Sequence, residues 1–202
     1  MPGENVEIMR RVHEAVREEI EFRDRPRRSL GERLFARFPR LGWRLSERIL
    51  SRPPSSGLRR RFLRLVTRRG YASLNRRDVA LNERVLYDEH SELVMHGDFP
   101  LGTGPFRGAK AIADAYREWL TAWDEQRIVP RELIDAGDKV AVITDEVATG
   151  AGSGIEMAMR RCEVVTMRDG RIDRHELFQD WEEGLRAAGV SERAIPAAEA
   201  RP

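Results

Sequence analysis

The chain has 202 residues and a net charge of +2, with 41% hydrophobic and 35% charged residues. This length predicts one domain with an elaboration, and the apolar fraction is sufficient for a buried core. The single cysteine, Cys162, excludes an internal disulfide framework and a cysteine-based zinc cluster, so we expect a reducing, cytoplasmic setting.

The first predicted element is a helix over residues 5–20, where apolar side chains recur at helical spacing between charges. Those charges exclude a secretory signal, because such a signal requires an uninterrupted apolar stretch. No apolar run approaches the roughly 20 residues needed to cross a bilayer. The chain is therefore expected to be able to lie on a membrane but not to span one.

Residues 23–77 form what we call the basic segment. It holds 18 arginines, no lysine and three acidic residues, so its net charge is +15 and the remainder of the chain carries −13. Prolines divide the segment, because proline lacks the N–H that a helix needs. Short helices are predicted at 30–38, 41–51 and 58–74. Leucine and phenylalanine give these helices an apolar side, which a disordered tail would lack.

The rest of the chain is predicted to begin with a short helix after residue 78. A strand at 91–96, a loop rich in glycine and proline, and a helix at 109–124 follow. Further strands are predicted at 128–135, 139–149, 155–167 and 171–179, with a last short helix after them. Glycine-containing turns between these strands predict hairpins, because glycine adopts positive φ at little cost. Helices followed by an antiparallel meander indicate an α+β fold.

Three passages resemble the SnoaL-like family of the nuclear transport factor 2-like superfamily. They are PFRGAKAIADAYREWLTAWDEQRIVPRELIDAGDKVAVI, GAGSGIEMAMRRCEVVTMRDGRI and FQDWEEGLRAAG. The resemblance covers about residues 73–190. In addition, ENVEIMRRVHEAV is similar to the first helix of the family, which normally runs into an "FNRRD" element that stands here as SLNRRD at 73–78.

The resemblance implies a single SnoaL-like domain over residues 1–202, within which residues 21–72 are an Arg-rich helical insertion. The implied fold is a cone-shaped α+β barrel, in which a curved antiparallel sheet packs on helices around a central pocket. The resemblance also implies a homodimer. Because one fold supports many activities, it does not identify a reaction.

Two classes of function remain open. The first is a pocket for a small, mostly apolar ligand, with isomerase, cyclase, lyase or hydrolase activity that uses a histidine base and no cofactor. The second is a non-catalytic binding or scaffolding protein. An enclosed cavity with His96 and a second polar group pointing into it would favour the first class, and a filled barrel would favour the second.

Four residues are candidates for catalysis through the resemblance. His96 ends the first predicted strand, where ketosteroid isomerases of this fold place a general base, and Asp98 could orient it. His175 matches the histidine of an "HWD" setting in the polyketide cyclases, but Glu176 follows it here instead of tryptophan, which counts against the usual cyclase chemistry. Asp180 lies at the end of the same strand. The simpler alternative for His96 is packing and hydrogen bonding at a strand end.

Candidate ligand-binding residues are His13, Tyr116, Trp119, Trp123 and Gln179. His13 lies near the position of an oxyanion-donating tyrosine in the isomerases, although a structural role is the more common one at a helix border. The three aromatic residues share one helix and either wall a pocket or fill the core. Gln179 shares the strand parity of His175.

Two further arrangements are less favoured. Arg160, Arg161, Asp145 and Glu163 lie on adjacent predicted strands and could supply the charges of an epoxide hydrolase-like site, but strand alternation sends about half of them to the other face. Three of the four histidines fall at pocket positions, yet no HxH or HxxxH spacing is present, so a metal-free site is expected.

The basic segment has three interpretations. In the structural one, which we prefer because both ends of the segment must return to the fold, Leu34, Phe35, Phe62 and Leu65 are buried against the barrel. In the second, the basic amphipathic helices lie on an anionic membrane surface. Nucleic acid is a less expected partner, because the segment contains no recognised binding motif.

Overall fold

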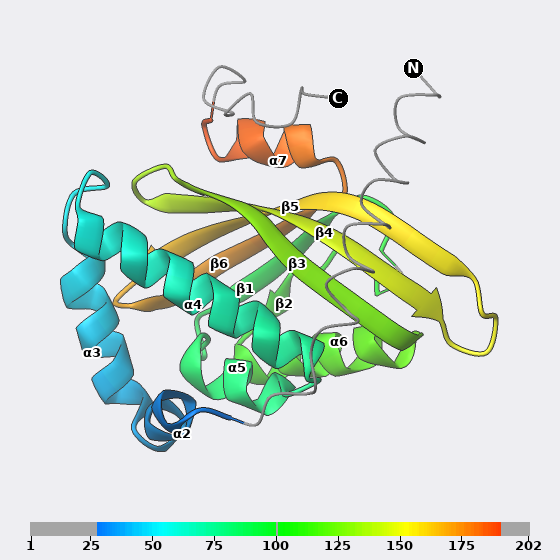
Figure 1. The fold of residues 1–202 in the computed structure, drawn as a ribbon, viewed down its shortest axis with the longest axis horizontal. Coiled ribbons are helices and arrows are strands. Elements are labelled where there is room, and N and C mark those ends of the chain that lie inside the picture. Colours follow the sequence, from blue (N-terminus) through cyan, green and yellow to red (C-terminus); the bar gives the residue numbers. More distant parts are fainter. Residues whose placement is uncertain (1–27, 100, 191–202) are drawn as a thin grey trace.

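The computed structural model describes residues 28–99 and 101–190 of the chain. Its elements there are α2 (Leu30–Arg37), α3 (Pro39–Leu50), α4 (Gly57–Asn75), α5 (Val79–Val85), β1 (Glu92–His96), β2 (Phe106–Arg107), α6 (Ala109–Thr121), β3 (Trp123–Asp135), β4 (Lys139–Gly150), β5 (Glu156–Arg168), β6 (Arg171–Phe178) and α7 (Trp181–Ala187). In these ranges six strands form one curved sheet, in the order β2-β1-β6-β5-β4-β3 (Figure 1).

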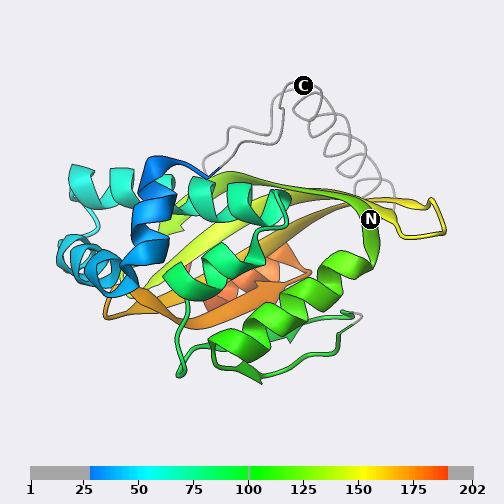
Figure 2. The same cartoon turned by 90° about the horizontal axis from the view of Figure 1, so that it is seen from below.

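The arrangement confirms the predicted α+β fold. All neighbouring strands are antiparallel except β1 and β6, which run parallel. Helices α4, α5 and α6 lie over one face of the sheet, as Figure 2 shows from below. Helix α7 covers part of the other face. The strands therefore have to present apolar side chains in both directions.

One predicted boundary moves because of strand pairing. Helix α6 ends at Thr121 rather than at residue 124, and β3 begins at Trp123, five residues earlier than predicted. The cause is the length of the hairpin, since β3 pairs with β4 from Trp123 opposite Gly150 to Asp135 opposite Val140. The ladder bonds of these extra pairs satisfy backbone groups that the sequence pattern assigns to a helix.

Alternation along β5 decides which side chains meet the helices. Glu163 and Val165 face α4 and α6, whereas Cys162 and Val164 pack with Leu185 of α7 on the opposite face. The same alternation holds along β6, with one irregularity in its pairing with β5 between residues 166 and 167. Glu163 and Val165 therefore lie on the face of the sheet that α4 and α6 cover.

The three helices predicted in the basic segment are present as α2, α3 and α4. Helix α4 crosses the sheet, where its Leu63 and Tyr71 pack with Ile128, Val140 and Val142. None of the helices in the described ranges is both long and apolar enough to cross a bilayer.

Arg59 anchors α4 to the sheet through a buried ion pair. Its Nε and Nη2 each donate to a carboxylate oxygen of Asp135 at 2.8 Å. Its Nη1 donates to the carbonyl oxygens of Leu50 and Arg52, and Nη2 also donates to the carbonyl oxygen of Gly137. One guanidinium therefore connects the start of α4, the end of α3 and the β3–β4 turn.

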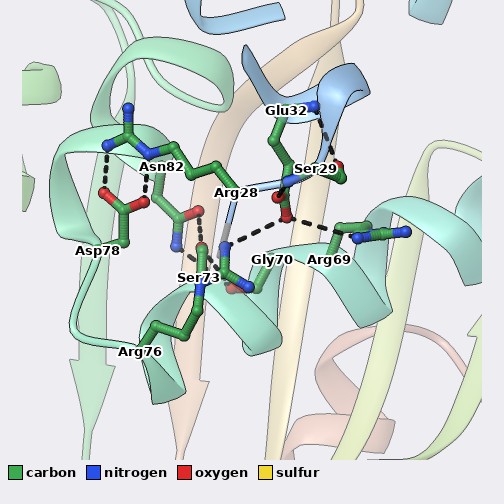
Figure 3. Close-up of polar contacts among 9 residues, drawn as sticks. All are labelled: Arg28, Ser29, Glu32, Arg69, Gly70, Ser73, Arg76, Asp78 and Asn82. Atoms are coloured by element: carbon green, nitrogen blue, oxygen red, sulfur yellow. Dashed lines mark hydrogen bonds and ion pairs between the residues drawn. The ribbon is translucent and has the colours of Figure 1, made fainter. Parts of the chain in front are cut away.

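Further ion pairs connect α2 to the helices that follow it (Figure 3). Glu32 accepts a hydrogen bond from the backbone N–H of Ser29 at 2.6 Å in a capping box, and its other oxygen lies 3.2 Å from Arg76 Nη2. Arg28 forms a two-point pair with Asp78, which precedes α5. Glu32 and Asp78 thus hold the start of the basic segment against the helices that follow it.

Trp43 fixes α3 against the β5–β6 turn. Its Nε1 donates to the carbonyl oxygen of Val85 at 2.8 Å, and the Arg171 guanidinium carbon lies 5.3 Å from the centroid of its ring. Gly170 in the turn has a φ of 78°, and a Cβ there would lie 2.0 Å from the Trp43 carbonyl oxygen. Only glycine permits both this backbone conformation and this approach.

The apolar residues of the basic segment point in two directions. Phe35 and Phe62 line an interior cavity. Leu34 and Leu65, expected to be buried with them, are instead 51% and 56% exposed. The structural interpretation therefore holds for the inner side of these helices and not for the outer side.

We predict that Arg59→Ala destabilises the fold by about 3–5 kcal/mol, because removing one partner of a buried pair leaves the other charge without compensation. Urea unfolding measures the change. The exposed neighbour substitution Arg60→Ala is the matched control and should stay within about 0.5 kcal/mol of wild type. Equal effects of the two substitutions would contradict the anchoring role of Arg59.

Candidate functional site

An interior cavity of about 150 Å³ lies between α3, α4 and the sheet. Its wall on the helix side comes from the basic segment, with Phe35 on α2, Trp43 on α3 and Phe62 on α4. Apolar side chains of β4, β5 and β6 form most of the opposite wall. The remaining apolar lining residues are Leu63, Val66, Leu74, Val85, Leu86, Val140, Val142, Val165, Met167 and Ile172. Most of the cavity is therefore apolar.

Polar groups gather at one part of this cavity, around His175 on β6. Its Nε2 lies 2.9 Å from an oxygen of Glu163 on the neighbouring strand β5. Its Nδ1 lies 2.8 Å from the hydroxyl of Tyr87 and 3.3 Å from that of Tyr116. All four residues line the cavity, and Glu163 and His175 are each only 5% exposed. A carboxylate, an imidazole and two phenols therefore meet away from bulk water.

The Glu163 carboxyl is ionised in this environment. Burial by itself raises its pKa, but the hydrogen bond and charge of His175, the charge of Arg161 and a hydrogen bond from Tyr71 hold the pKa below its ordinary value. An ionised carboxylate only accepts hydrogen bonds, so the Nε2 of His175 must carry the proton between them.

That assignment fixes the rest of the network. If His175 is neutral and Nε2 is protonated, then Nδ1 carries a lone pair and accepts the Tyr87 O–H. Burial, reinforced by the Glu163 charge, raises the pKa values of Tyr71, Tyr87 and Tyr116, so each phenol keeps its proton. With a neutral His175, the cavity therefore presents one nitrogen lone pair next to two phenolic O–H groups.

A second polar group extends from the same face of β5. Arg161 forms a buried ion pair with Glu146 on β4, and Gln126 donates to that carboxylate from β3. The Arg161 guanidinium carbon lies 5.8 Å from the centroid of the Trp119 ring. Arg161, Gln126 and Trp119 border a smaller cavity of about 20 Å³, which shares Leu74, Tyr116 and Glu163 with the main cavity. The positive charge of Arg161 therefore helps to lower the pKa of the neighbouring Glu163 carboxyl.

The structure brings two of the predicted site residues together, His175 and Tyr116. Trp119 borders the smaller cavity, and the ring of Trp123 packs edge-on against the ring of Trp119 with their centroids 5.3 Å apart. His13 lies outside the described residues. Arg161 and Glu163 face the cavities, whereas their proposed companions Arg160 and Asp145 pair with each other on the opposite face of the sheet.

The other predicted catalytic histidine lies outside both cavities. His96 stacks on Phe178 with centroids 4.1 Å apart, and its Nε2 is 3.1 Å from Glu176. The parallel pairing of β1 with β6 sets His96 opposite Phe178, on the sheet face that α7 covers. Its neighbour Met95 instead packs in the core beneath the helices. Strand alternation accordingly separates His96 from His175.

The remaining predicted residues have contacts near the ends of β1 and β6. Gln179 accepts from the backbone N–H of Asp98 at 3.0 Å and donates to its carbonyl oxygen at 2.7 Å. Asp180 caps α7 by accepting from the backbone N–H groups of Glu182 and Glu183. None of these described residues lines either cavity.

Sequence reasoning missed Tyr71 and Tyr87 and assigned Glu163 to a different set. The available signal was strand parity, because Arg161, Glu163 and Val165 alternate with apolar residues that face α7. The tyrosines had no such signal. Tyr87 follows a short helix and Tyr71 lies in an arginine-rich one, and only the packing of these helices on the sheet brings their hydroxyls to the cavity.

Comparison with known proteins agrees with this architecture. The chain resembles an NTF2-like protein of unknown function from Burkholderia pseudomallei at 23% identity, covering 59% of this chain and 92% of that one with a TM-score of 0.51. It is also similar to TerC, which was co-crystallised with polyporic acid, at 25% identity, with coverage of 59% and 92% and a TM-score of 0.48. A protein with a ketosteroid isomerase-like fold from Catenulispora acidiphila, in complex with trimethylamine, matches at 13% identity, with coverage of 62% and 93% and a TM-score of 0.49.

A search of the curated proteins gives no match. The sequence model of the SnoaL-like domain, however, matches residues 67–175, which is more than half of the chain and contains Glu163, His175 and all three tyrosines of the cavity. The match begins within α4 and ends on β6. By this match and by its curved sheet packed on helices, the chain belongs to the SnoaL-like domain family.

Proposed function

We propose that this chain binds one small, mostly apolar molecule in the main cavity and that His175 exchanges a proton with it. The observation that carries the proposal is the pairing of His175 with Glu163 in the polar part of an otherwise apolar cavity. Apolar walls with a few convergent polar groups are the usual composition of a ligand site. A barrel filled by side chains would instead favour the scaffolding alternative.

The volume of the cavity limits the size of the ligand. An apolar cavity of about 150 Å³ is known to hold benzene. The ligand that fits without rearrangement is therefore a compact molecule of about one ring, with a single oxygen directed to His175, Tyr87 and Tyr116.

The proton transfer follows from the hydrogen bonds. The lone pair on Nδ1 of His175 accepts a proton from an activated C–H or O–H of the ligand, and the Glu163 carboxylate stabilises the resulting imidazolium through Nε2. Tyr87 and Tyr116 turn their O–H groups to the ligand oxygen on which negative charge develops. Isomerisation, cyclisation, elimination and hydrolysis all share such a step, so the proposal stops at proton transfer.

Binding is tested by filling the cavity. Val66 lines it, whereas the adjacent Leu65 is exposed outside it. Val66→Phe should abolish binding of a single-ring ketone such as cyclohexenone, measured by ligand-observed NMR, because the larger side chain occupies the space. Leu65→Phe is the matched control and should bind as wild type does. Equal binding by both variants would place the ligand elsewhere.

Catalysis is tested by replacing His175 and His96 by alanine, one at a time. In any reaction found by screening cyclic ketones and enols, His175→Ala should lower kcat by about 10²–10⁴, the usual contribution of a general base. His96→Ala should leave kcat unchanged, because its side chain lies outside the cavity. A loss of kcat in His96→Ala but not in His175→Ala would contradict the proposal and assign the general base to His96.

The lowered pKa of Glu163 predicts a pH-dependent stability. A carboxyl whose pKa is lower in the folded than in the unfolded state contributes stability above the unfolded value of about 4.3, and that contribution is lost as the pH falls through the folded pKa. Glu163→Gln should therefore cost roughly 2 kcal/mol at neutral pH and progressively less in acid. Urea unfolding across pH measures it, and a pH-independent difference would contradict the assignment.

A further inference from the structure

The outward sides of the helices in the basic segment expose large apolar side chains. In the described part of the chain, eight large hydrophobic residues stand out as exposed, and seven of them lie on this segment. On α2 and at its C-cap they are Leu30, Leu34 and Phe38, which recur every fourth residue and so form one stripe. The eighth is Ile155, in the turn between β4 and β5.

The next two helices repeat the pattern. Leu41 and Leu45 are one turn apart on α3, and Leu58 and Leu65 are two turns apart on α4. Their exposed fractions lie between 46% and 59%. Each helix thus has an inner side that packs on the protein and an outer side that also carries leucine. Packing in the described structure accounts for the inner sides alone.

The same outer surface is strongly basic. Apart from the buried Arg59, the ten arginines from Arg33 to Arg68 are all exposed, and none forms an ion pair with a described residue. The one acidic residue between Arg33 and Arg68 is Glu47, and the preceding Glu32 is buried and paired with Arg76. Exposed apolar side chains and positive charges that have no ionic partner among the described residues therefore occur along three consecutive helices.

We propose that the outer surface of α2, α3 and α4 docks on a lipid bilayer that contains anionic headgroups. An interfacial helix places leucine and phenylalanine at the acyl boundary while its arginines contact headgroup phosphates, and both parts of this surface are then satisfied. A nucleic acid would bind the arginines but leave the leucines in water. A second copy of the chain would cover the leucines but bring like charges together.

The docked orientation would set the cavity close to the lipid. Phe35, Trp43 and Phe62 wall the cavity from the inner sides of the helices whose outer sides contact the bilayer. An apolar ligand dissolved in the membrane would then be separated from the cavity by one layer of helices. The docking proposal itself does not depend on the proposed function of the cavity.

Sedimentation of the full chain with vesicles tests the proposal. The protein should sediment with vesicles of phosphatidylcholine and phosphatidylglycerol at low salt and be released at high salt, because salt screens the exposed charges. Retention on pure phosphatidylcholine should be much weaker. The absence of retention on the anionic vesicles at low salt would overturn the proposal.

Two sets of variants separate the contribution of the arginines to vesicle binding from that of the leucines. Substituting Arg37, Arg44, Arg61 and Arg64 together by glutamine should weaken vesicle binding on the order of a thousandfold, from about one kcal/mol for each arginine near the surface. The matched control replaces Arg168 and Arg186, which lie on the β5 end and on α7, and should bind as wild type does.

The apolar set is Leu34→Ser, Leu41→Ser and Leu65→Ser combined, with Ile155→Ser as the matched control. The triple variant should lose retention at moderate salt although its charge is unchanged, and the control should keep it. Thermal unfolding confirms that both remain folded. If the triple variant binds vesicles as wild type does, or binds duplex DNA and vesicles equally, the surface is a general polyanion site and the proposal fails. Sedimentation velocity in which the triple variant converts a dimer to a monomer would instead assign the leucines to a second copy.

Discussion

The buried carboxylate of Glu163 is the constraint on which the rest of this structure depends. A charge removed from water costs several kcal/mol unless partners surround it. Its partners come from different parts of the chain: His175 from β6, Tyr71 from α4 and Arg161 from the same strand. The position of one carboxylate therefore couples the register of the β5–β6 hairpin to the docking of α4. A shift of one residue in that register would turn His175 to the opposite face.

The cavity lies between the sheet face that carries Glu163 and the helices of the basic segment. These helices are held against the sheet by the Arg59–Asp135 ion pair and by the close contact of α3 with Gly170. The hydrogen bonds around Glu163 fix the polar side chains at one part of the cavity wall, and apolar side chains form most of the rest.

Much of the fold could be predicted from the sequence, because the apolar periodicity of a helix or strand and the glycines of a turn depend only on neighbouring residues. The helix at 109–124 and the four strands after it were located to within a few residues, except at the start of β3, where pairing with β4 overrides the local pattern. The resemblance to the SnoaL-like family supplied the curved sheet. Strand parity placed His175 and Gln179 on one face, and His175 does line the cavity, whereas Gln179 lies beyond the end of β6 and does not.

The rest of the site depends on tertiary contacts that no local pattern contains. The prediction for His96 relied on its place at the end of a strand, but its direction is decided by the register between β1 and β6. Tyr71 and Tyr87 reach the cavity only because α4 and the end of α5 pack on the sheet. The exposure of Leu34 and Leu65 could not be predicted from the sequence either. An amphipathic pattern shows that a helix has an apolar stripe, but it does not show which apolar side chains pack against the rest of the protein.

Arginine has two different roles in the basic segment. Inside, the guanidinium of Arg59 donates to one carboxylate and three carbonyl groups at once, which the single ammonium of lysine could not do in this geometry. Outside, Arg37, Arg44 and Arg64 are exposed on the same helices as the exposed leucines, where a guanidinium remains in contact with water. Helix α4 carries both kinds of residue, since Leu58 and Leu65 are exposed on its outer side and Phe62 and Tyr71 line the cavity on its inner side. Docking of the outer side of α4 would therefore bring this part of the cavity wall next to the bilayer.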